Sequence, residues 1–337
     1  MKALRLHGVG DLRLHEEPDA CAGEGELLID VTAVGLCGSD RHWLVEGGIG
    51  DAALEQPLVL GHEFVGVVAS GRRSGERVAL DPAVPCGRCA VCAAGLSHLC
   101  PEMRFAGHGR TDGALRTRLA WPERLAHPLP DGIPDAEAAL LEPLGVALHA
   151  LDLGHVRDGT TAGVFGCGPI GLLLVQALSA CAAETVVATD PLSHRRAAAE
   201  ASGSARAVDP DAIAGVSLPG GLGVDVAFEA AGTDEALADA VAAVRPGGRI
   251  VLVGIPDGDR TSFAASAVRR KGLTLLLCRR MEAEDLPRAV ELAAAGRVDL
   301  GGLVGERHPL SAWEQAFAAL VEQRTLKVVV EPQQDVA

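Results

Sequence analysis

Four cysteines in the stretch CGRCAVCAAGLSHLC could bind one metal ion together. They are Cys86, Cys89, Cys92 and Cys100. Thiolates at this spacing can surround Zn²⁺ tetrahedrally, and four protein sulfurs would leave no coordination position for water or substrate. A pair of disulfides is the alternative, but nine cysteines in 337 residues are too few for a disulfide scaffold. We therefore predict a structural zinc that stabilises this loop.

A second set of possible metal ligands is spread along the first half of the chain. It comprises Cys37 in GLCGSDRHW, His62 and Glu63 in LGHEF, and Glu142 in LLEPLGVALHA. A thiolate, an imidazole and a carboxylate supply three ligands to zinc and leave a fourth position open, which distinguishes a catalytic site from a structural one. Each residue taken alone is ordinary, because a single cysteine is usually a small core residue.

A glycine-rich motif indicates a nucleotide-binding loop. The motif GCGPIG, residues 166–171, directly follows the apolar segment TAGVF and opens a helical pattern, which is the context that a dinucleotide fingerprint requires. Gly166 would permit the tight turn, Gly168 would let the backbone approach a pyrophosphate, and Gly171 would allow close helix packing. The helix N-terminus would face the phosphate charge.

Asp190 ends the next apolar segment, nineteen residues after Gly171. A carboxylate at this place can accept hydrogen bonds from both adenosine ribose hydroxyls, and it would repel a 2′-phosphate. The sequence therefore favours NAD over NADP, although the nearby His194, Arg195 and Arg196 could weaken the discrimination. The alternative is that Asp190 is only a helix N-cap before PLSHRR.

The predicted elements change character along the chain. Before about residue 130, short strands such as GELLIDVTAVG, EFVGVVAS and GERVAL lie between glycines or polar residues. Helical periodicity begins in DAEAALLEPLGVALHAL. Five near-continuous apolar segments follow, as expected of a parallel sheet covered on both faces: TAGVFG, ETVVATD, GVDVAFEA, RIVLVGIP and GLTLLLC. Helices are predicted between them at 170–183, 194–201 and 234–244, the last one ended by the Pro-Gly-Gly at 246–248.

The last part of the chain returns to a mixed pattern. AEDLPRAVELAAAG and SAWEQAFAALVEQ are predicted to be amphipathic helices, and KVVVEP a closing strand. We therefore predict an α/β protein in which a doubly wound, Rossmann-type domain at 150–284 is inserted into a β-rich domain. The β-rich domain would consist of residues 1–149 and 285–337.

Charge and composition limit the partners. Acidic residues outnumber basic ones by 45 to 30, and the formal net charge is −15, which opposes nonspecific binding to nucleic acid or to anionic membranes. The apolar runs fall short of the ~20 residues that a membrane helix needs, and the N-terminal segment does not resemble a signal peptide. We expect a small-molecule partner and a reducing, cytoplasmic location.

These motifs occur together, in order, in one family. The chain resembles the zinc-dependent medium-chain alcohol and polyol dehydrogenases in GLCGSDRHW, GHE, the four-cysteine loop, EPLGVALHA, GCGPIG and the aspartate of ATD. It is most similar to the sorbitol, xylitol and idonate dehydrogenase branch in EGGIG, TDGALR and Arg279 after LTLLLC. The resemblance implies a GroES-like catalytic domain carrying the inserted Rossmann domain.

The resemblance also implies roles for particular residues. Cys37 and His62 would ligate the catalytic zinc, with Glu63 or Glu142 as the third ligand. Ser39 and His42 match the proton-relay positions. The residues that match substrate-binding positions are Trp43, Glu142, Arg279 and Arg280. Those expected to contact NAD are Gly166, Gly168, Ile170, Gly171, Asp190, Arg195, Val253, Gly254 and Ile255.

The expected reaction is oxidation of a secondary alcohol of a polyol or sugar acid to the ketone, with zinc as the Lewis acid and hydride transfer to NAD. L-Threonine dehydrogenase, aminocyclitol (scyllo-inosamine-like) dehydrogenase and a non-catalytic NAD-binding scaffold are the alternatives. Arg280 replaces an aromatic residue of the family, and a second cation at this place favours an acidic sugar as the substrate.

The apolar segment GLTLLLC predicts an exposed strand edge. We therefore expect a homodimer or homotetramer.

Overall fold

The computed structural model describes residues 1–218, 221–258 and 260–335. The chain divides into two compact units. Unit 1 consists of Met1–Glu142, Glu282–Ala294 and Leu300–Ala337, and unit 2 of Pro143–Met281 and Ala295–Asp299. The chain thus leaves unit 1 after residue 142 and returns after 281, where the sequence suggests 149 and 284.

Unit 2 contains a parallel sheet of six strands in the order β15-β14-β13-β16-β17-β18. Every neighbouring pair runs parallel. The strands are β13 (Thr161–Phe165), β14 (Glu184–Thr189), β15 (Ala207–Val208), β16 (Val224–Glu229), β17 (Val244–Leu252) and β18 (Thr274–Leu277). The order reverses between β13 and β16, which is the switch point at which doubly wound sheets bind ligands. The predicted doubly wound sheet is confirmed.

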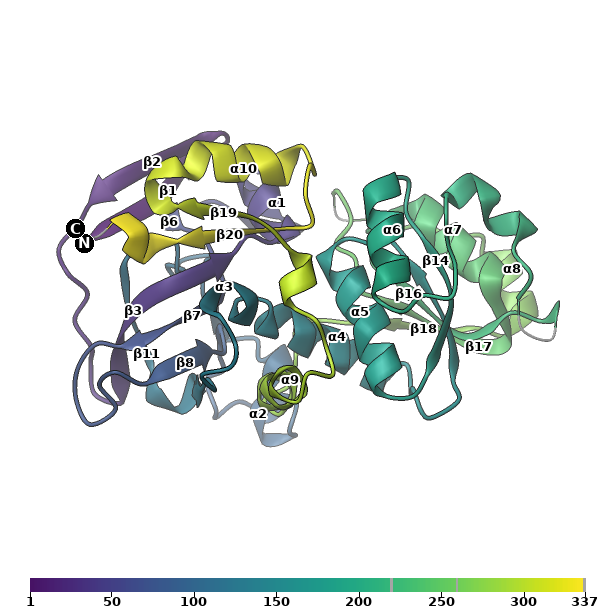
Figure 1. Ribbon diagram of the computed structural model, residues 1–337, viewed down its shortest axis with the longest axis horizontal. Coiled ribbons are helices and arrows are strands. Elements are labelled where there is room, and N and C mark those ends of the chain that lie inside the picture. Colours follow the sequence, from purple (N-terminus) through teal and green to yellow (C-terminus); the bar gives the residue numbers. More distant parts are fainter. Residues whose placement is uncertain (219–220, 259, 336–337) are drawn as a thin grey trace. The chain divides into compact units, whose positions relative to one another are not determined.

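Helices cover both faces of this sheet. In Figure 1, α5 (Pro169–Ala180) and α6 (Ser193–Ala201) lie in front of it, and α7 (Asp234–Ala243) and α8 (Ala265–Lys271) lie behind it. The central strands are therefore buried on both sides, with Val164, Phe165 and Phe228 fully inaccessible. This burial explains why their sequences are almost continuously apolar.

Two helix predictions in unit 2 need correction. Helix α5 ends at Ala180, three residues before the predicted end. The Pro-Gly-Gly at 246–248 lies inside β17 and does not separate the helix from the strand. The pairing of β17 with β16 shifts register between Val224 and Val226. Proline is tolerated within a sheet at such an irregularity, because no ladder hydrogen bond is lost there.

Unit 1 is built on a seven-stranded, mainly antiparallel sheet in the order β12-β8-β7-β3-β20-β19, with β11 also paired to β3. Its strands are β3 (Glu26–Gly35), β7 (Glu63–Val68), β8 (Arg77–Leu80), β11 (Arg118–Pro122), β12 (Ala126–Pro128), β19 (Val304–Pro309) and β20 (Lys327–Glu331). Figure 1 shows the C-terminal strand β20 beside β3. The two ends of the chain thus build one sheet, as the prediction of an inserted domain requires.

Smaller elements complete unit 1. Three further sheets contain β1 (Lys2–Gly8), β2 (Asp11–Glu16) and β6 (Leu58–Val59); β9 (Ala83–Val84) and β10 (Arg104–Phe105); and β4 (Gly48–Ile49) and β5 (Ala52–Ala53). The helices are α1 (Gly38–Glu46), α2 (Ala90–Ala93), α3 (Asp135–Ala138), α9 (Asp285–Ala294) and α10 (Trp313–Val321). Within the described residues, every helix is too short or too polar to cross a lipid bilayer.

The helical segment predicted from Asp135 is two helices. Helix α3 ends at Ala138, and α4 (Leu141–Leu153) begins three residues later. Pro143 lies in the first turn of α4. A proline has no N–H to donate, and its ring clashes with the carbonyl four residues earlier, so a continuous helix cannot pass through Pro143. The break places Glu142 at the start of a helix.

Candidate active site and zinc loop

The four cysteines of the 86–100 loop converge. The Sγ atoms of Cys86 and Cys92 lie 4.0 Å apart, and those of Cys89 and Cys100 lie 3.9 Å apart. A tetrahedral zinc with Zn–S bonds of about 2.3 Å requires sulfur–sulfur separations of about 3.8 Å. A disulfide would need a separation of about 2.05 Å, and all four thiols are free. The donor set therefore fits one tetrahedral zinc.

Backbone amides support the thiolate form in this loop. The N–H of Cys86 donates to the sulfur of Cys100, and the N–H of Cys92 donates to that of Cys89, both at 3.4 Å. Backbone hydrogen bonds from Arg88 and Cys89 lower the pKa of Cys86 to about 7. At Cys92 burial raises the pKa to about 12, so the amides favour the thiolate at Cys86 only, and metal binding would displace the proton of Cys92.

A second cluster joins Cys37, His62 and Glu63, whose ligand atoms all lie within 4.8 Å of one another. The pairing of β3 with β7 sets Gly35 opposite Glu63. Cys37 follows β3 by two residues and is the N-cap of α1, while His62 directly precedes β7. A thiol, an imidazole and a carboxyl from adjacent strand ends thus form a donor set that fits zinc.

Asp40, which the sequence analysis did not single out, holds this cluster together. Its buried carboxylate accepts hydrogen bonds from the N–H of Cys37 at 2.9 Å and of Gly61 at 3.2 Å. Its Oδ1 lies 3.8 Å from Nδ1 of His62. Burial raises the pKa of Asp40. The His62 charge and the two backbone N–H groups reduce this increase without cancelling it. An acid three residues after an N-cap is the capping-box signal that could have identified it.

Lys327 is the second residue that the sequence analysis missed. It lies in β20 with 2% exposure, forms an ion pair with the Glu63 carboxylate, and donates to the carbonyl of Leu36 at 3.1 Å. Burial lowers the pKa of Lys327. The charges of Glu63 and Cys37 raise this pKa by more than burial lowers it, so the net shift is upward. The sequence offered one indication of this role. Lys327 begins the apolar run KVVVE, and a lysine in a buried strand rarely lacks an acidic partner.

Replacing Lys327 with methionine should lower the free energy of unfolding by about 3–5 kcal/mol, because the Glu63 carboxylate would stay buried without its cation. Chemical denaturation of the metal-free chain measures this change, because a bound zinc would itself compensate the Glu63 charge. The double variant Lys327→Met/Glu63→Gln should recover part of the loss, since it removes both charges. A single variant within about 1 kcal/mol of the wild type would show that the pair is dispensable.

Metal binding at the Cys37 cluster should depend on pH. Burial, with the nearby Glu63 charge, raises the pKa of Cys37 to about 12, so the metal-free thiol is protonated at neutral pH. Binding then releases this proton, and zinc affinity should rise about tenfold per pH unit between pH 6 and 8 from Cys37 alone. Chelator competition at several pH values measures the slope. An affinity that is constant over this range would exclude Cys37 as a ligand.

The other predicted site residues of unit 1 lie around this cluster. Glu142 lies outside the set of three, and burial raises its pKa to about 8, partly offset by the His62 charge. Ser39 Oγ lies 3.4 Å from His62 Nε2, while His42 Nδ1 pairs with Glu46 at 2.8 Å. Trp43 is 1% exposed in the core of unit 1. The structure therefore groups Glu63, not Glu142, with Cys37 and His62.

The glycine loop of unit 2 has the geometry of a phosphate cradle. Gly166 has φ +99°, and a Cβ there would lie 2.7 Å from the amide nitrogen of Ala231. A Cβ on Gly171 would lie 1.9 Å from the Gly166 carbonyl oxygen. Gly168, the N-cap of α5, faces open space, with Arg195 Nη1 the nearest atom at 3.8 Å from an added Cβ. A side chain at 168 would fill that space, so the loop fits a dinucleotide.

Asp190 and Arg195 border this loop. The Asp190 carboxylate accepts hydrogen bonds from the N–H groups of Cys167 and Leu192, both at 2.9 Å. The N-cap of α6 is Leu192, so the alternative interpretation of Asp190 as a helix N-cap is wrong. Arg195 Nη1 lies 3.7 Å from Asp190, and within the described residues its buried Nε has no hydrogen-bond acceptor. A bound ligand would supply one.

The remaining predicted contacts of unit 2 lie in helix α5 or directly after strands. Ile170 is the second residue of α5, residues 253–255 follow β17, and Arg279 and Arg280 follow β18, with φ +61° at Arg280. Glu229, at the end of β16, was not anticipated. Its buried side chain accepts from Ala231 and Gly232 at 2.8 and 2.7 Å, and its carbonyl accepts from the N–H groups of residues 253 and 254. It therefore positions the segment predicted to contact NAD.

Comparison with known proteins supports this reading of both units. The family described as "Alcohol dehydrogenase GroES-like domain" matches residues 23–131, and "Zinc-binding dehydrogenase" matches residues 169–295. Sorbitol dehydrogenase of Bacillus subtilis is 34% identical over 98% of this chain and 97% of its own length. The chain belongs to the zinc-binding alcohol dehydrogenase family.

Solved structures of this family agree over the full length. L-Idonate 5-dehydrogenase from Escherichia coli has a TM-score of 0.88 at 26% identity and covers 98% of this chain and 97% of its own. A zinc-binding dehydrogenase from Sinorhizobium meliloti, bound to NADP, has a TM-score of 0.88 at 30% identity, covering 98% and 99%. The expected combination of a GroES-like domain and a Rossmann-type domain in a zinc-binding dehydrogenase is confirmed.

Proposed function

We propose that this dehydrogenase oxidises a secondary alcohol of a polyol or sugar acid to the ketone, using zinc and NAD. The observation that carries the proposal is the convergence of Cys37, His62 and Glu63 in a chain that also has an intact dinucleotide loop. The similarity to a sorbitol dehydrogenase and to an L-idonate 5-dehydrogenase supports the substrate class. The intact donor set argues against a non-catalytic NAD-binding scaffold.

The chain's own residues divide the work. Cys37, His62 and Glu63 would hold a catalytic zinc, which supplies Lewis acidity toward the substrate oxygen when bound. The cysteine loop would hold a structural zinc. Ser39, whose hydroxyl contacts His62, begins the path that we assign to the released proton, and His42 with its Glu46 partner continues it.

We assign substrate selection to Trp43, Glu142, Arg279 and Arg280. Of these, Arg279 and Arg280 are two cations that favour a substrate carrying a carboxylate.

A substrate panel tests the proposed function. Sorbitol, xylitol, L-idonate, L-threonine and scyllo-inosamine are compared by initial rates of NADH formation over a range of concentrations of each. We expect kcat/KM for at least one polyol or for L-idonate to exceed the values for L-threonine and scyllo-inosamine by about tenfold or more. A preference for L-threonine or scyllo-inosamine would replace the proposal with one of those two alternatives.

Asp190 should decide between NAD and NADP. The variant Asp190→Ser removes the carboxylate that would accept from the ribose and repel a 2′-phosphate, so the NAD:NADP ratio of kcat/KM should fall about 100-fold. Steady-state kinetics with both cofactors measures this ratio. Asp209→Ser, a more exposed carboxylate that pairs with Arg196 at 3.2 Å, is the matched control and should leave the ratio unchanged. An unchanged ratio in Asp190→Ser would remove Asp190 from cofactor selection.

We further propose a cytoplasmic homo-oligomer, a dimer or a tetramer. Strand β18 is at the edge of its sheet, and Leu277 on it is 78% exposed. An apolar strand edge of this kind favours pairing with a second copy. The absence of disulfides among the described cysteines supports a reducing compartment. Light scattering that gives a single-chain mass at micromolar concentration would contradict the oligomer.

A further inference from the structure

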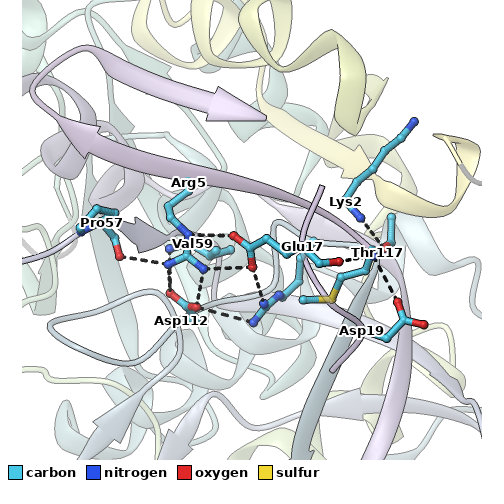
Figure 2. Close-up of polar contacts among 10 residues, drawn as sticks. Lys2, Arg5, Glu17, Asp19, Pro57, Val59, Asp112 and Thr117 are labelled. Carbon is cyan, nitrogen blue, oxygen red and sulfur yellow. Dashed lines mark hydrogen bonds and ion pairs between the residues drawn. The ribbon is translucent and has the colours of Figure 1, made fainter. Parts of the chain in front are cut away.

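Four charged side chains of unit 1 form a cluster that we call the Arg5 cluster: Arg5, Glu17, Asp112 and Arg116. Figure 2 shows the Arg5 guanidinium between the Glu17 and Asp112 carboxylates. Its Nη1 and Nη2 donate to the two oxygens of Asp112 at 2.9 Å each, and its Nε donates to Glu17 at 3.0 Å. Arg116 donates to Glu17 at 3.2 Å. The Arg5 and Glu17 side chains are only about one-fifth exposed, so solvent screens this pairing incompletely.

The Arg5 cluster is tied to the backbone that leads to His62. Asp112 Oδ1 also accepts from the N–H of Val59 at 3.0 Å, and Arg5 Nη1 donates to the carbonyl of Pro57 at 3.0 Å. Both contacts are visible in Figure 2. Charge-assisted, bidentate pairs of this kind have defined geometry as well as strength. The cluster therefore joins β1, the segment 57–59 and the loop that contains Asp112.

The residues after Asp112 pair with the residues before His62. Three backbone N–H groups donate to consecutive carbonyls: Gly113 to Val59 at 2.7 Å, Leu115 to Leu60 at 2.9 Å, and Ala114 to Gly61 at 2.9 Å. A Cβ on Gly113 would lie 2.3 Å from the Gly61 carbonyl oxygen. The two segments are thus in direct backbone contact up to the residue that precedes the imidazole.

Gly61 is held from its other side as well. It has φ +91°, and a Cβ there would lie 2.8 Å from a methyl of Val34. Its N–H donates to Asp40, which also accepts from the N–H of Cys37. Gly61 is thus fixed between the 113–115 segment and Asp40, so loss of the support from 113–115 would leave Gly61, and the adjoining His62, held from one side only.

We infer that Asp112, anchored by Arg5, is a positioning residue for the zinc ligand His62. Asp112 touches neither the donor atoms of the site nor a reacting group, so it acts through the backbone. Metal affinity requires ligand distances within about 0.2 Å of their ideal values, and outer-sphere partners commonly contribute 10- to 100-fold in affinity. This inference rests on the proposed function, because it assumes that His62 binds the catalytic zinc.

Zinc affinity of the full-length chain tests the inference. Zinc-loaded protein is titrated with a chromogenic chelator, which resolves the catalytic zinc from the tighter cysteine-loop zinc. We expect Asp112→Ala to weaken the catalytic site about 10- to 100-fold and to leave the cysteine-loop zinc unchanged. Asp112→Asn, which keeps an acceptor for the Val59 N–H, should fall between this variant and the wild type.

Asp30→Ala is the matched control. Asp30 pairs with Arg118 at 2.7 Å and is 32% exposed, close to the 29% of Asp112, but it lies in β3 opposite Val67, five residues after His62. Its loss should lower stability without weakening the catalytic zinc by more than about threefold. The inference is overturned if Asp112→Ala binds zinc as the wild type does, or if Asp30→Ala weakens the site equally. A wild-type chain with one zinc instead of two would instead overturn the proposed function, and this inference with it.

Discussion

Serine in place of Cys37 should lower kcat for alcohol oxidation by at least about 1,000-fold, equivalent to about 4 kcal/mol of transition-state stabilisation. The substitution removes the sulfur that we propose as a ligand of the catalytic zinc, and an alcohol oxygen is a poor substitute for a thiolate at zinc. The measurement is steady-state NADH formation on the best substrate of the panel, with the zinc content of the same sample.

Two controls separate loss of the site from loss of the fold. Cys21 is an exposed, free thiol of the same unit, so Cys21→Ser should keep the wild-type kcat. Binding of NADH to Cys37→Ser, followed by nicotinamide fluorescence, should stay within about threefold of the wild type, because the predicted cofactor contacts lie in unit 2. A Cys37→Ser enzyme with full activity would refute the assignment of the catalytic zinc.

Cys100→Ser should have the largest effect on stability. Cys100 is 3% exposed and lies 3.9 Å from the sulfur of Cys89, so its loss leaves the metal with three sulfurs and a poorly matched hydroxyl. If about 4 kcal/mol of metal-dependent stabilisation is lost, the melting temperature should fall by about 10 °C. Thermal unfolding followed by circular dichroism measures this shift.

The control for this second prediction is Cys181→Ser, an exposed cysteine outside the loop, which should melt within about 2 °C of the wild type. Exhaustive chelation removes both zinc ions from the wild-type protein, so it should lower the melting temperature at least as much as Cys100→Ser does. If Cys100→Ser melts at the wild-type temperature, the loop is stable without zinc, and the assignment of a structural role to this zinc is wrong.

The features that the sequence revealed are those encoded locally. The spacing of Cys86, Cys89, Cys92 and Cys100 over fifteen residues already specifies a four-sulfur site. The glycines of residues 166–171 likewise have their turn and helix start within one segment. Such short-range patterns are readable because the chain between the functional atoms leaves few alternative geometries.

The features that the sequence concealed depend on long-range pairing. Lys327 meets Glu63 only because β20 pairs with β3 and β3 with β7, a register that no local pattern specifies. The Asp112 carboxylate accepts from the N–H of Val59 in β6, which lies 53 residues earlier in the chain. The choice between Glu63 and Glu142 was undecidable for the same reason, since both carboxylates have suitable chemistry and only the sheet register brings Glu63 beside Cys37.

Zinc K-edge X-ray absorption of the purified, full-length enzyme tests the central claim most directly. One zinc bound by four sulfurs and a second bound by one sulfur with nitrogen and oxygen ligands would give an average of about 2.5 sulfurs per zinc. We predict this value. An average close to four sulfurs would mean that only the cysteine loop holds zinc, and it would contradict the assignment of Cys37, His62 and Glu63 as the catalytic metal site.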